Sequence, residues 1–351
     1  MRTVHKKVVK HMLFSRDIGI DLGTATTSVC VKGKGIIMRE PSVVAYDVRT
    51  DQVKAVGTAA KEMIGRTPGS IVAVRPLKNG VIADFDVTAA MLTRFIKDSQ
   101  KGSLFSRTRV VVSIPAGVTE VEARAVYDAV KQAGGSEVDL LEVPVAAAIG
   151  AGLPINEPTG FMIVDIGGGT TEIAIISLGG IVTAQSVRQA GDQMDEAIMN
   201  YVRRKHRLVI GERTAEEIKI KLGSATSYQG EGKMEISGRN VDESLPRSVV
   251  ITASEVRDAL RPVIDKIIDA IKNTLEKTPP ELAADILNNG ITLTGSGAEL
   301  RGLAGYISSE TEFSVTVAEN PGDCVVLGTL KKLDEESGLD SFVFRRGKQY
   351  R

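Results

Sequence analysis

The chain has 351 residues, 42% of them apolar and 25% charged, which is ordinary usage for a globular protein and exceeds what one hydrophobic core usually supports. Its 44 basic and 44 acidic side chains give no formal net charge, which argues against a nucleic-acid-binding protein, because such binding requires an excess of Lys and Arg on one face. No apolar stretch approaches the roughly 18 residues of a membrane span, and the two cysteines lack the spacing of a metal site or redox motif.

The first predicted element is a strand, a turn and a second strand near the N-terminus. Residues 18–20 and 29–31 are apolar, and the turn between them begins with the sequence D-L-G-T at Asp21. Small residues in such a turn let backbone N–H groups approach an anion closely. A carboxylate beside an anion requires a bridging cation, and Mg²⁺ fits because it binds through one or two carboxylates, water and phosphate oxygens. The unit therefore predicts a phosphate-binding hairpin with a magnesium ligand.

Strands and helices alternate after this hairpin. The apolar run Val110–Ile114 predicts a strand, and Thr119–Gln132 predicts a helix that has acidic residues in its first turn and glycines after its end. A further helix begins at Pro144 and is expected to end at one of the next glycines, and a proline-containing linker at 153–158 marks a domain crossing. This alternation is typical of an α/β protein.

The strand, turn and strand unit then occurs a second time. The sequence D-I-G-G-G-T-T begins at Asp165, between apolar runs at 161–164 and 173–176. One D-x-G-T match is weak evidence, because glycine after a strand is ordinary turn chemistry. Two copies predict two similar domains that face each other across a cleft, and each domain offers a phosphate-binding hairpin to one nucleotide.

The last third of the chain predicts mostly helices and one more glycine turn. Helices are expected at about 193–205, 214–222 and 254–277, with short antiparallel strands between Ser224 and Val250. A strand, a glycine turn and a helix start follow at 291–300. In the company of two phosphate hairpins, this turn is interpreted as the loop on the adenosine side of the nucleotide, with contacts from Gly295, Ser296, Gly297 and Ala298.

In their order along the chain, these motifs resemble those of the actin-like ATPases. A D-x-G-T turn, a P-V-A-A-A-I-G helix, a D-I-G-G-G-T-T turn and a T-G-x-G turn follow one another. Four further segments, at 17–25, 40–45, 75–85 and 210–216, look like bacterial MreB and its Mbl-type paralogues, and the resemblance covers roughly residues 15 to 333. It implies an actin-like ATPase fold of the α/β class, in which two duplicated ribonuclease-H-like domains surround a nucleotide cleft and each carries a smaller subdomain.

The resemblance also implies domain boundaries. They are a basic tail or amphipathic helix at 1–14, domain I at 15–155 with a small subdomain at about 37–85, domain II at 156–330 with a small subdomain at about 195–250, and a C-terminal helix and basic tail at 331–351, the helix packing back on domain I.

Site residues follow from the resemblance position by position. It implies that Asp21 and Asp165 hold Mg²⁺ through water and that Glu216 and Lys219 touch the ribose and adenine of ATP. On spacing alone, this last pair lies on one helix face and is more often a solvated ion pair. The implied phosphate contacts are Gly23, Thr24, Ala25 and Thr26 in the first turn and Gly167, Gly168, Gly169 and Thr170 in the second, and the implied catalytic residues are Thr170, Asp165 and Glu142.

One departure from the family concerns hydrolysis. A Glu that orients the attacking water usually stands directly before the Pro of the P-x-A-A-A-I-G helix, but here that residue is Val143, and Glu142 lies one position earlier. A shift of one residue at a helix start turns a side chain by about a hundred degrees, so Glu142 is not expected to reach the same water. We expect nucleotide binding with hydrolysis that is slow even for this family. Thr26 and Ser296 also replace residues that are common in the family, Asn and Gly.

Membrane attachment is the second functional expectation. Leu104 and Phe105 are adjacent large apolar residues in a predicted loop between Lys101 and Arg107, and the similar loop of MreB relatives is a membrane anchor. Residues 1–14 carry basic side chains and apolar side chains spaced four apart, as in a basic amphipathic helix. A misassigned start or a disordered tail explains those residues equally well.

The function implied by the resemblance is that of a cytoskeletal filament. It implies a cytoplasmic protein with weak ATPase activity that polymerises into paired protofilaments on the inner membrane face, binds anionic lipid, and works with the cell-wall elongation machinery to maintain rod shape. Two alternatives share the fold, a metabolite kinase and the nucleotide-binding part of a chaperone. The sequence offers no clear sugar pocket, and too few residues follow Leu330 for a substrate-binding domain.

Overall fold

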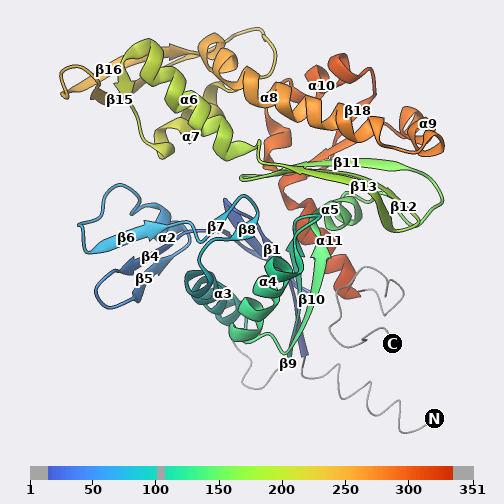
Figure 1. The fold of residues 1–351 in the computed structure, drawn as a ribbon. Helices are drawn as coiled ribbons and strands as arrows, with labels where there is room; N and C mark the ends of the chain where they lie inside the picture. The colour runs from blue at the N-terminus through green and yellow to red at the C-terminus, as the bar shows by residue number, and fades with distance from the viewer. Residues whose placement is uncertain (1–14, 101–106, 335–351) are drawn as a thin grey trace, which may run out of the picture. The chain divides into compact units, whose positions relative to one another are not determined.

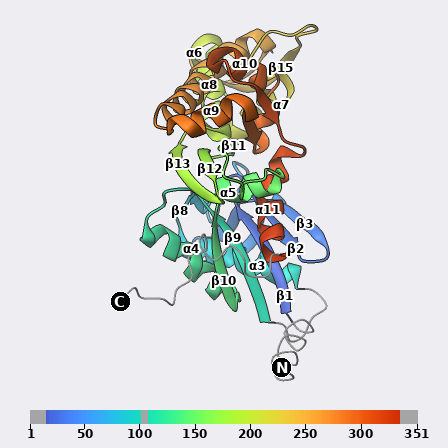
Figure 2. The same cartoon turned by 90° about the vertical axis from the view of Figure 1, so that its right-hand side faces the viewer.

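The computed structural model describes residues 15–100 and 107–334, which form two compact units (Figures 1 and 2). Unit 1 contains the described residues up to Pro154 together with those from Asp323 onward, and unit 2 is Ile155–Gly322. The chain therefore leaves unit 1, builds all of unit 2, and returns to unit 1. The predicted membrane residues Leu104 and Phe105, the segment 1–14 and the basic tail lie outside the described residues.

Unit 1 is built on a five-stranded sheet. Its strands lie in the order β10-β9-β1-β2-β3. The pairs β1–β2 and β2–β3 are antiparallel, and the pairs β1–β9 and β9–β10 are parallel. Val110, Val111 and Val112 of β9 are all fully buried, so elements cover both faces of the sheet. The strands are β1 (Ser15–Leu22), β2 (Thr26–Val31), β3 (Gly35–Pro41), β9 (Arg107–Ile114) and β10 (Glu137–Glu142).

Different helices cover the two faces of this sheet. The helices α3 (Phe85–Ser99) and α4 (Glu120–Gln132) form one core with Ile18 and Ile20 of β1. On the other face, α11 (Cys324–Asp334) packs against β1, β9 and α5 (Val143–Gly150). A capping box between Thr119 and Glu122 begins α4, as the predicted helix start requires.

The contact of α5 with α11 depends on glycine. A Cβ atom on Gly328 of α11 would lie 1.9 Å from the carbonyl oxygen of Ala146, and one on Gly150 of α5 would lie 1.8 Å from that of Cys324. Likewise, a Cβ on Gly19 of β1 would lie 2.3 Å from Thr329 Oγ1. At Gly150 and Gly328 two backbones approach more closely than any side chain allows, and at Gly19 the space that a Cβ would need is filled by the side chains of Thr329 and Cys30. The helix from the far end of the chain is therefore fitted tightly to the first strand.

A smaller part of unit 1 carries short strands. β5 (Gln52–Val56), β4 (Val44–Asp47) and β6 (Ile71–Val74) form an antiparallel sheet, next to the short helix α2 (Thr58–Lys61). A separate hairpin, β7 (Leu77–Lys78) and β8 (Val81–Ile82), turns at Asn79 and Gly80, which both have positive φ. Two central residues with positive φ are the requirement of a type I′ hairpin turn, for which Asn-Gly is a preferred sequence.

Unit 2 repeats the sheet of unit 1. The order β13-β12-β11-β17-β18 has the same succession of antiparallel and parallel pairs as β3-β2-β1-β9-β10. This identity of topology confirms the predicted duplication. The strands are β11 (Phe161–Ile166), β12 (Thr171–Ser177), β13 (Gly180–Val187), β17 (Ile291–Thr294) and β18 (Val315–Val317).

The helices of unit 2 pack on this sheet and on a second, smaller one. The long helix α8 (Ala253–Glu276) contacts β12, β13 and β16, and α6 (Gly191–His206) packs against α7 (Glu212–Leu222) and α8 (Figure 1). The smaller sheet, β14-β15-β16, contains the antiparallel strands predicted between 224 and 250. The remaining elements are β14 (Leu208–Val209), β15 (Lys233–Asn240), β16 (Pro246–Thr252), α9 (Pro280–Asn289), α10 (Leu303–Thr311) and the 3₁₀ turns η1 (Ser296–Glu299) and η2 (Pro321–Asp323), the last at the return to unit 1.

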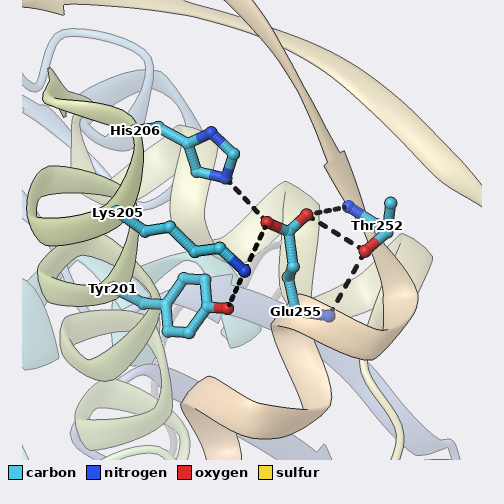
Figure 3. A network of polar contacts seen from close by, with 5 residues as sticks. All are labelled: Tyr201, Lys205, His206, Thr252 and Glu255. Atoms are coloured by element: carbon cyan, nitrogen blue, oxygen red, sulfur yellow. Dashed lines mark hydrogen bonds and ion pairs between the residues drawn. The ribbon is translucent and has the colours of Figure 1, made fainter.

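A polar network joins the end of α6 to the start of α8 (Figure 3). Glu255 Oε2 accepts hydrogen bonds from Thr252 N at 2.9 Å and Thr252 Oγ1 at 3.0 Å, while its Oε1 faces His206 Nε2 at 3.0 Å and Lys205 Nζ at 3.2 Å. Lys205 also donates to the hydroxyl of Tyr201 at 2.9 Å. Burial opposes ionisation of Glu255, but the bonds from Thr252 and Lys205 prevail and hold its pKa below the usual value. One carboxylate thus caps α8 and binds α6.

Within the described residues, no helix is long and apolar enough to cross a bilayer.

Candidate functional site

The first acidic-glycine turn connects β1 to β2, and Ser42, which lies between β3 and β4, holds it by hydrogen bonds. A Cβ on Gly23 would lie 2.5 Å from Thr26 O, so the turn closes on itself tightly. Ser42 Oγ donates to Gly23 O at 2.6 Å, and Ser42 N donates to Ala25 O at 3.0 Å. Because these carbonyls have partners inside unit 1, the turn has a fixed shape before any ligand binds.

Thr24, at the tip of this turn, is bound to the β7–β8 hairpin. Its side chain is 6% exposed, and Oγ1 accepts a hydrogen bond from Gly80 N at 2.9 Å. The hydroxyl can still donate through its own hydrogen. Thr26, by contrast, is exposed. Segment 75–85 was part of the family resemblance, and the structure gives it a local role, since its turn fixes a predicted phosphate-binding side chain.

Asp21 lies at the end of β1, beside β9. Ser113 Oγ donates to Asp21 Oδ1 at 2.9 Å and also accepts from Leu22 N at 3.1 Å. Burial raises the pKa of Asp21 to about 6, and the Ser113 hydrogen bond offsets this only in part. A half-buried carboxylate held by a hydroxyl donor favours a cation close by.

The second turn, between β11 and β12, has the same form and is attached to the start of α6. Gly167 N donates to Thr170 O at 3.0 Å inside the turn. Gly191 N donates to Gly167 O at 3.1 Å and Asp192 N to Gly168 O at 2.8 Å. The first amides of α6 are therefore used to hold the turn. Thr170, the predicted water-positioning residue, is half-buried in it.

Asp165 occupies in β11 the position that Asp21 has in β1. It is 6% exposed, and Thr294 Oγ1 of the neighbouring β17 donates to its Oδ1 at 2.8 Å. Each aspartate thus follows an apolar strand and receives a hydroxyl from the adjacent parallel strand. No three His, Cys, Asp or Glu side chains in the described parts of the chain form a metal cluster. One carboxylate at each turn fits Mg²⁺, which completes its shell with water and phosphate oxygens.

The predicted adenosine-side loop lies directly against the end of β11. Gly295 has a φ of 78°, and a Cβ there would lie 2.3 Å from Ile166 O. A Cβ on Gly297 would lie 2.3 Å from Ile166 Cγ2. Only glycine permits the backbone to approach Ile166 so closely at these two positions. Of the other two residues of the loop, Ala298 is buried and Ser296 is exposed. The loop and the second turn are therefore neighbours within unit 2.

Lys219 is the predicted site residue with the most specific environment. It extends from the last turn of α7 to α6, where Nζ donates to Asp195 Oδ2 at 2.9 Å and to Gly191 O at 3.0 Å. The solvated Glu216–Lys219 ion pair, which spacing alone favours, is not how this lysine is engaged. Glu216 is half-buried on the same helix and adds a like charge near Asp195.

Glu142 and Val143 lie where β10 passes into α5. Glu142 precedes the helix as its N-cap residue, and Val143 is the first helical residue and half-exposed. Burial raises the pKa of Glu142, and a backbone hydrogen bond with Gly117 works against this shift. The Glu142 carboxylate is thus engaged by the connection between β9 and α4.

Within each unit the structure brings the predicted residues together. Unit 1 groups Asp21, the first turn and the β7–β8 hairpin, and unit 2 groups Asp165, the second turn, Lys219 and the 295–298 loop. Ser113, Thr294 and Asp195 hold predicted site residues in place and were missed by the sequence analysis. No short motif identifies them, because each contacts its partner from a distant part of the chain.

Comparison with known proteins places these features in a family. Residues 15–341 match the family model described as MreB/Mbl protein. The chain is 51% identical to cell shape-determining protein Mbl of Bacillus subtilis, over 93% of this chain and 98% of that protein. It is 50% identical to cell shape-determining protein MreB of Escherichia coli K12, over 92% of this chain and 94% of that protein. The crystal structure of MreB 5 of Spiroplasma citri bound to AMPPNP superposes on this structure with a TM-score of 0.86 and 39% sequence identity. The match covers 90% of this chain and 95% of that chain.

Proposed function

The chain belongs to the MreB/Mbl family of actin-like proteins, and from this premise we propose that it binds ATP and polymerises into membrane-associated filaments that determine cell shape. The observation that carries the proposal is the repeated hairpin. Each unit has the same sheet topology and presents, at the same place in that sheet, a glycine turn preceded by an aspartate that accepts a hydrogen bond from a hydroxyl of the neighbouring parallel strand. A relative of the same fold was solved with the ATP analogue AMPPNP.

We assign the nucleotide contacts residue by residue. Thr24 and its neighbours in the first turn and Gly167–Thr170 in the second bind phosphate oxygens through backbone N–H groups and hydroxyls. Lys219 and the 295–298 loop bind the nucleoside. The support is local: hydrogen bonds within its own unit fix each turn before nucleotide arrives.

Asp21 and Asp165 are the proposed Mg²⁺ residues. When bound, the ion supplies positive charge that neutralises the phosphates and draws electron density from the bond to be broken. The chain's own part is to hold two carboxylates in a fixed orientation, through the hydroxyls of Ser113 and Thr294.

Removal of the Asp21 charge is expected to have a pH-dependent effect. At pH 7.5, above the raised pKa of about 6, Asp21 is ionised, so Asp21→Asn should weaken Mg-ATP binding by about tenfold. As the pH falls to 5, wild-type Asp21 takes up a proton and its affinity should approach that of the variant. Calorimetric titration of both proteins at each pH measures the difference between their Mg-ATP affinities. Protonation of ATP affects both affinities equally and therefore does not contribute to this difference.

Ser113→Ala provides the matched control for this assignment. Loss of the Ser113 hydroxyl removes a bond that favours ionised Asp21, and therefore raises the pKa of Asp21 further. When Ser113→Ala is present, the affinities of the proteins with Asp21 and with Asn at position 21 should become equal at a higher pH than they do without it. A difference between wild type and Asp21→Asn that stays undiminished at pH 5 would show that the Asp21 charge does not act on the magnesium complex.

Polymerisation and membrane binding are tested in one experiment. We expect negative-stain electron microscopy of the full chain with Mg-ATP to show paired filaments on liposomes that contain anionic lipid, and few on zwitterionic liposomes. Leu104→Ser with Phe105→Ser should leave filaments in solution but remove them from the lipid, because the predicted anchor loses its apolar side chains. Monomers and bare liposomes in the wild-type sample would instead favour a nucleotide-binding protein that does not polymerise, such as a metabolite kinase.

The proposed reaction is slow hydrolysis of ATP to ADP and phosphate. Thr170 is assigned to the attacking water, and Val143 supplies no group that can take a proton from it. We expect that Glu142 does not replace the missing carboxylate, since it lies one residue earlier and has a backbone hydrogen bond with Gly117.

A further inference from the structure

The ammonium group of Lys219 is held more firmly than a surface lysine. Its side chain is 19% exposed and that of its partner Asp195 is 11% exposed. Lys219 Nζ donates to Asp195 Oδ2 at 2.9 Å and to Gly191 O at 3.0 Å, and Asp195 Oδ1 also lies 2.9 Å from it. With the carboxylate on one side and the Gly191 carbonyl on another, the direction of the remaining N–H is fixed as well.

These contacts place the ammonium beside the second turn. A Cβ on Gly191 would lie 3.4 Å from Lys219 Nζ, 3.5 Å from Gly167 O and 3.5 Å from Gly168 Cα. The same residue donates its N–H to Gly167 O at 3.1 Å. One glycine therefore touches both the lysine and the turn that we assign to phosphate.

Stability alone does not account for Asp195. Burial raises its pKa to about 6, the attraction of Lys219 offsets only part of this, and the like charges of Glu216 on α7 and Asp192 on α6 add to the rise. Asp195 is therefore ionised at neutral pH, but its ionised form is less favourable in the folded protein than in the unfolded chain. A buried ion pair of this kind is often no more stabilising than well-packed apolar residues.

We propose that Asp195 is a positioning residue for nucleotide binding, which fixes the Lys219 ammonium at the edge of the second turn so that its third N–H meets the bound nucleotide in one orientation. This inference rests on the proposed function. Because Asp195 already balances the charge of Lys219, the lysine acts as an oriented donor and adds no net charge to the site. Without the Asp195 carboxylate, the side chain of Lys219 regains its rotamer freedom in the free protein. Nucleotide binding must then remove this freedom, which costs affinity.

A double-mutant cycle on ADP affinity tests the role. By calorimetric titration of Mg-ADP into the full chain, we expect Asp195→Asn to weaken binding about tenfold and Lys219→Met to weaken it at least as much. The double variant should bind no more weakly than Lys219→Met, since Asp195 acts through the lysine. Glu196→Gln, which removes an exposed carboxylate next in sequence on α6, is the matched control and should bind like wild type.

A conservative variant separates positioning from folding. Asp195→Glu keeps the charge within reach of Lys219 and should recover most of the affinity that Asp195→Asn loses, even if both are equally destabilised in thermal unfolding. If the two single losses add in the double variant, or if Asp195→Asn binds ADP like wild type, Asp195 does not position Lys219. A wild-type chain that binds no ADP overturns the proposed function itself, whereas additive losses overturn only the positioning role.

Discussion

Gly328→Val is expected to destabilise unit 1 by about 3 kcal/mol or more, because overpacking a tight helix contact typically costs 1–3 kcal/mol and here the clash is with backbone. The new Cβ would lie 1.9 Å from Ala146 O and 2.5 Å from Ala146 C. Neither atom can move without displacing α5 from α11. The loss reaches the site as well, since α5 begins at Val143 and α11 packs on β1, which ends beside Asp21.

Thermal unfolding measures this effect. For units of this size, 3 kcal/mol corresponds to a fall in Tm of roughly 10 °C. Because two units need not unfold together, amide hydrogen exchange in β1 and β9 against β11 and β12 assigns the loss to unit 1. Gly305→Ala in the exposed part of α10 is the control: nothing lies within 4 Å of its new Cβ, and alanine should stabilise a helix by about 0.5–1 kcal/mol. A Gly328 variant as stable as wild type would show that α5 and α11 are not fitted as described.

Val143→Glu is expected to raise the rate of phosphate release from ATP by about 100-fold, at the low end of what a positioned proton acceptor contributes. The position accepts the change readily. Val143 is half-exposed and is the first residue of α5, where a negative charge interacts favourably with the helix dipole. Affinity for ADP should stay the same, since ADP binding does not use the attacking water.

The control for this prediction is Val143→Gln, which has the same shape and cannot act as a base. A phosphate-release assay under single-turnover conditions compares the two variants with wild type, and only the glutamate should accelerate the reaction. If Glu and Gln give equal rates, position 143 does not activate the water. If wild type already hydrolyses as fast as Val143→Glu, another group supplies the base.

Local sequence patterns predicted the fold well where the signal was local. The acidic residues after Thr119 and the glycines beyond Gln132 predicted α4, and Pro144 predicted the start of α5, which the structure places one residue earlier, at Val143. The repeated hairpins predicted the duplication, which the two equivalent sheets confirm. Family membership, predicted from motifs and four further segments, is likewise confirmed.

Contacts between distant residues were beyond sequence reasoning. The spacing of Glu216 and Lys219 places them on one helix face, but it cannot reveal that Lys219 turns to Asp195 on another helix. The same holds for Ser113, whose hydroxyl reaches Asp21 across 92 positions of sequence. Gly150 was expected only as a possible helix end and Gly328 was given no role, and the structure shows that both permit the close contact of α5 with α11. Such partners depend on tertiary packing, which no periodicity encodes.

The return of the chain to unit 1 has a consequence for synthesis on the ribosome. Unit 2 is continuous in sequence and is complete once Gly322 has emerged, whereas β1 and β9 lack the helix that covers one of their faces until α11 follows. The surface around Gly19 and Cys30 thus stays open to water and to chaperones during translation of some 170 residues, from Pro154 to Asp323. The half of the molecule that is made first is finished last, the reverse of the usual N-terminal-first order.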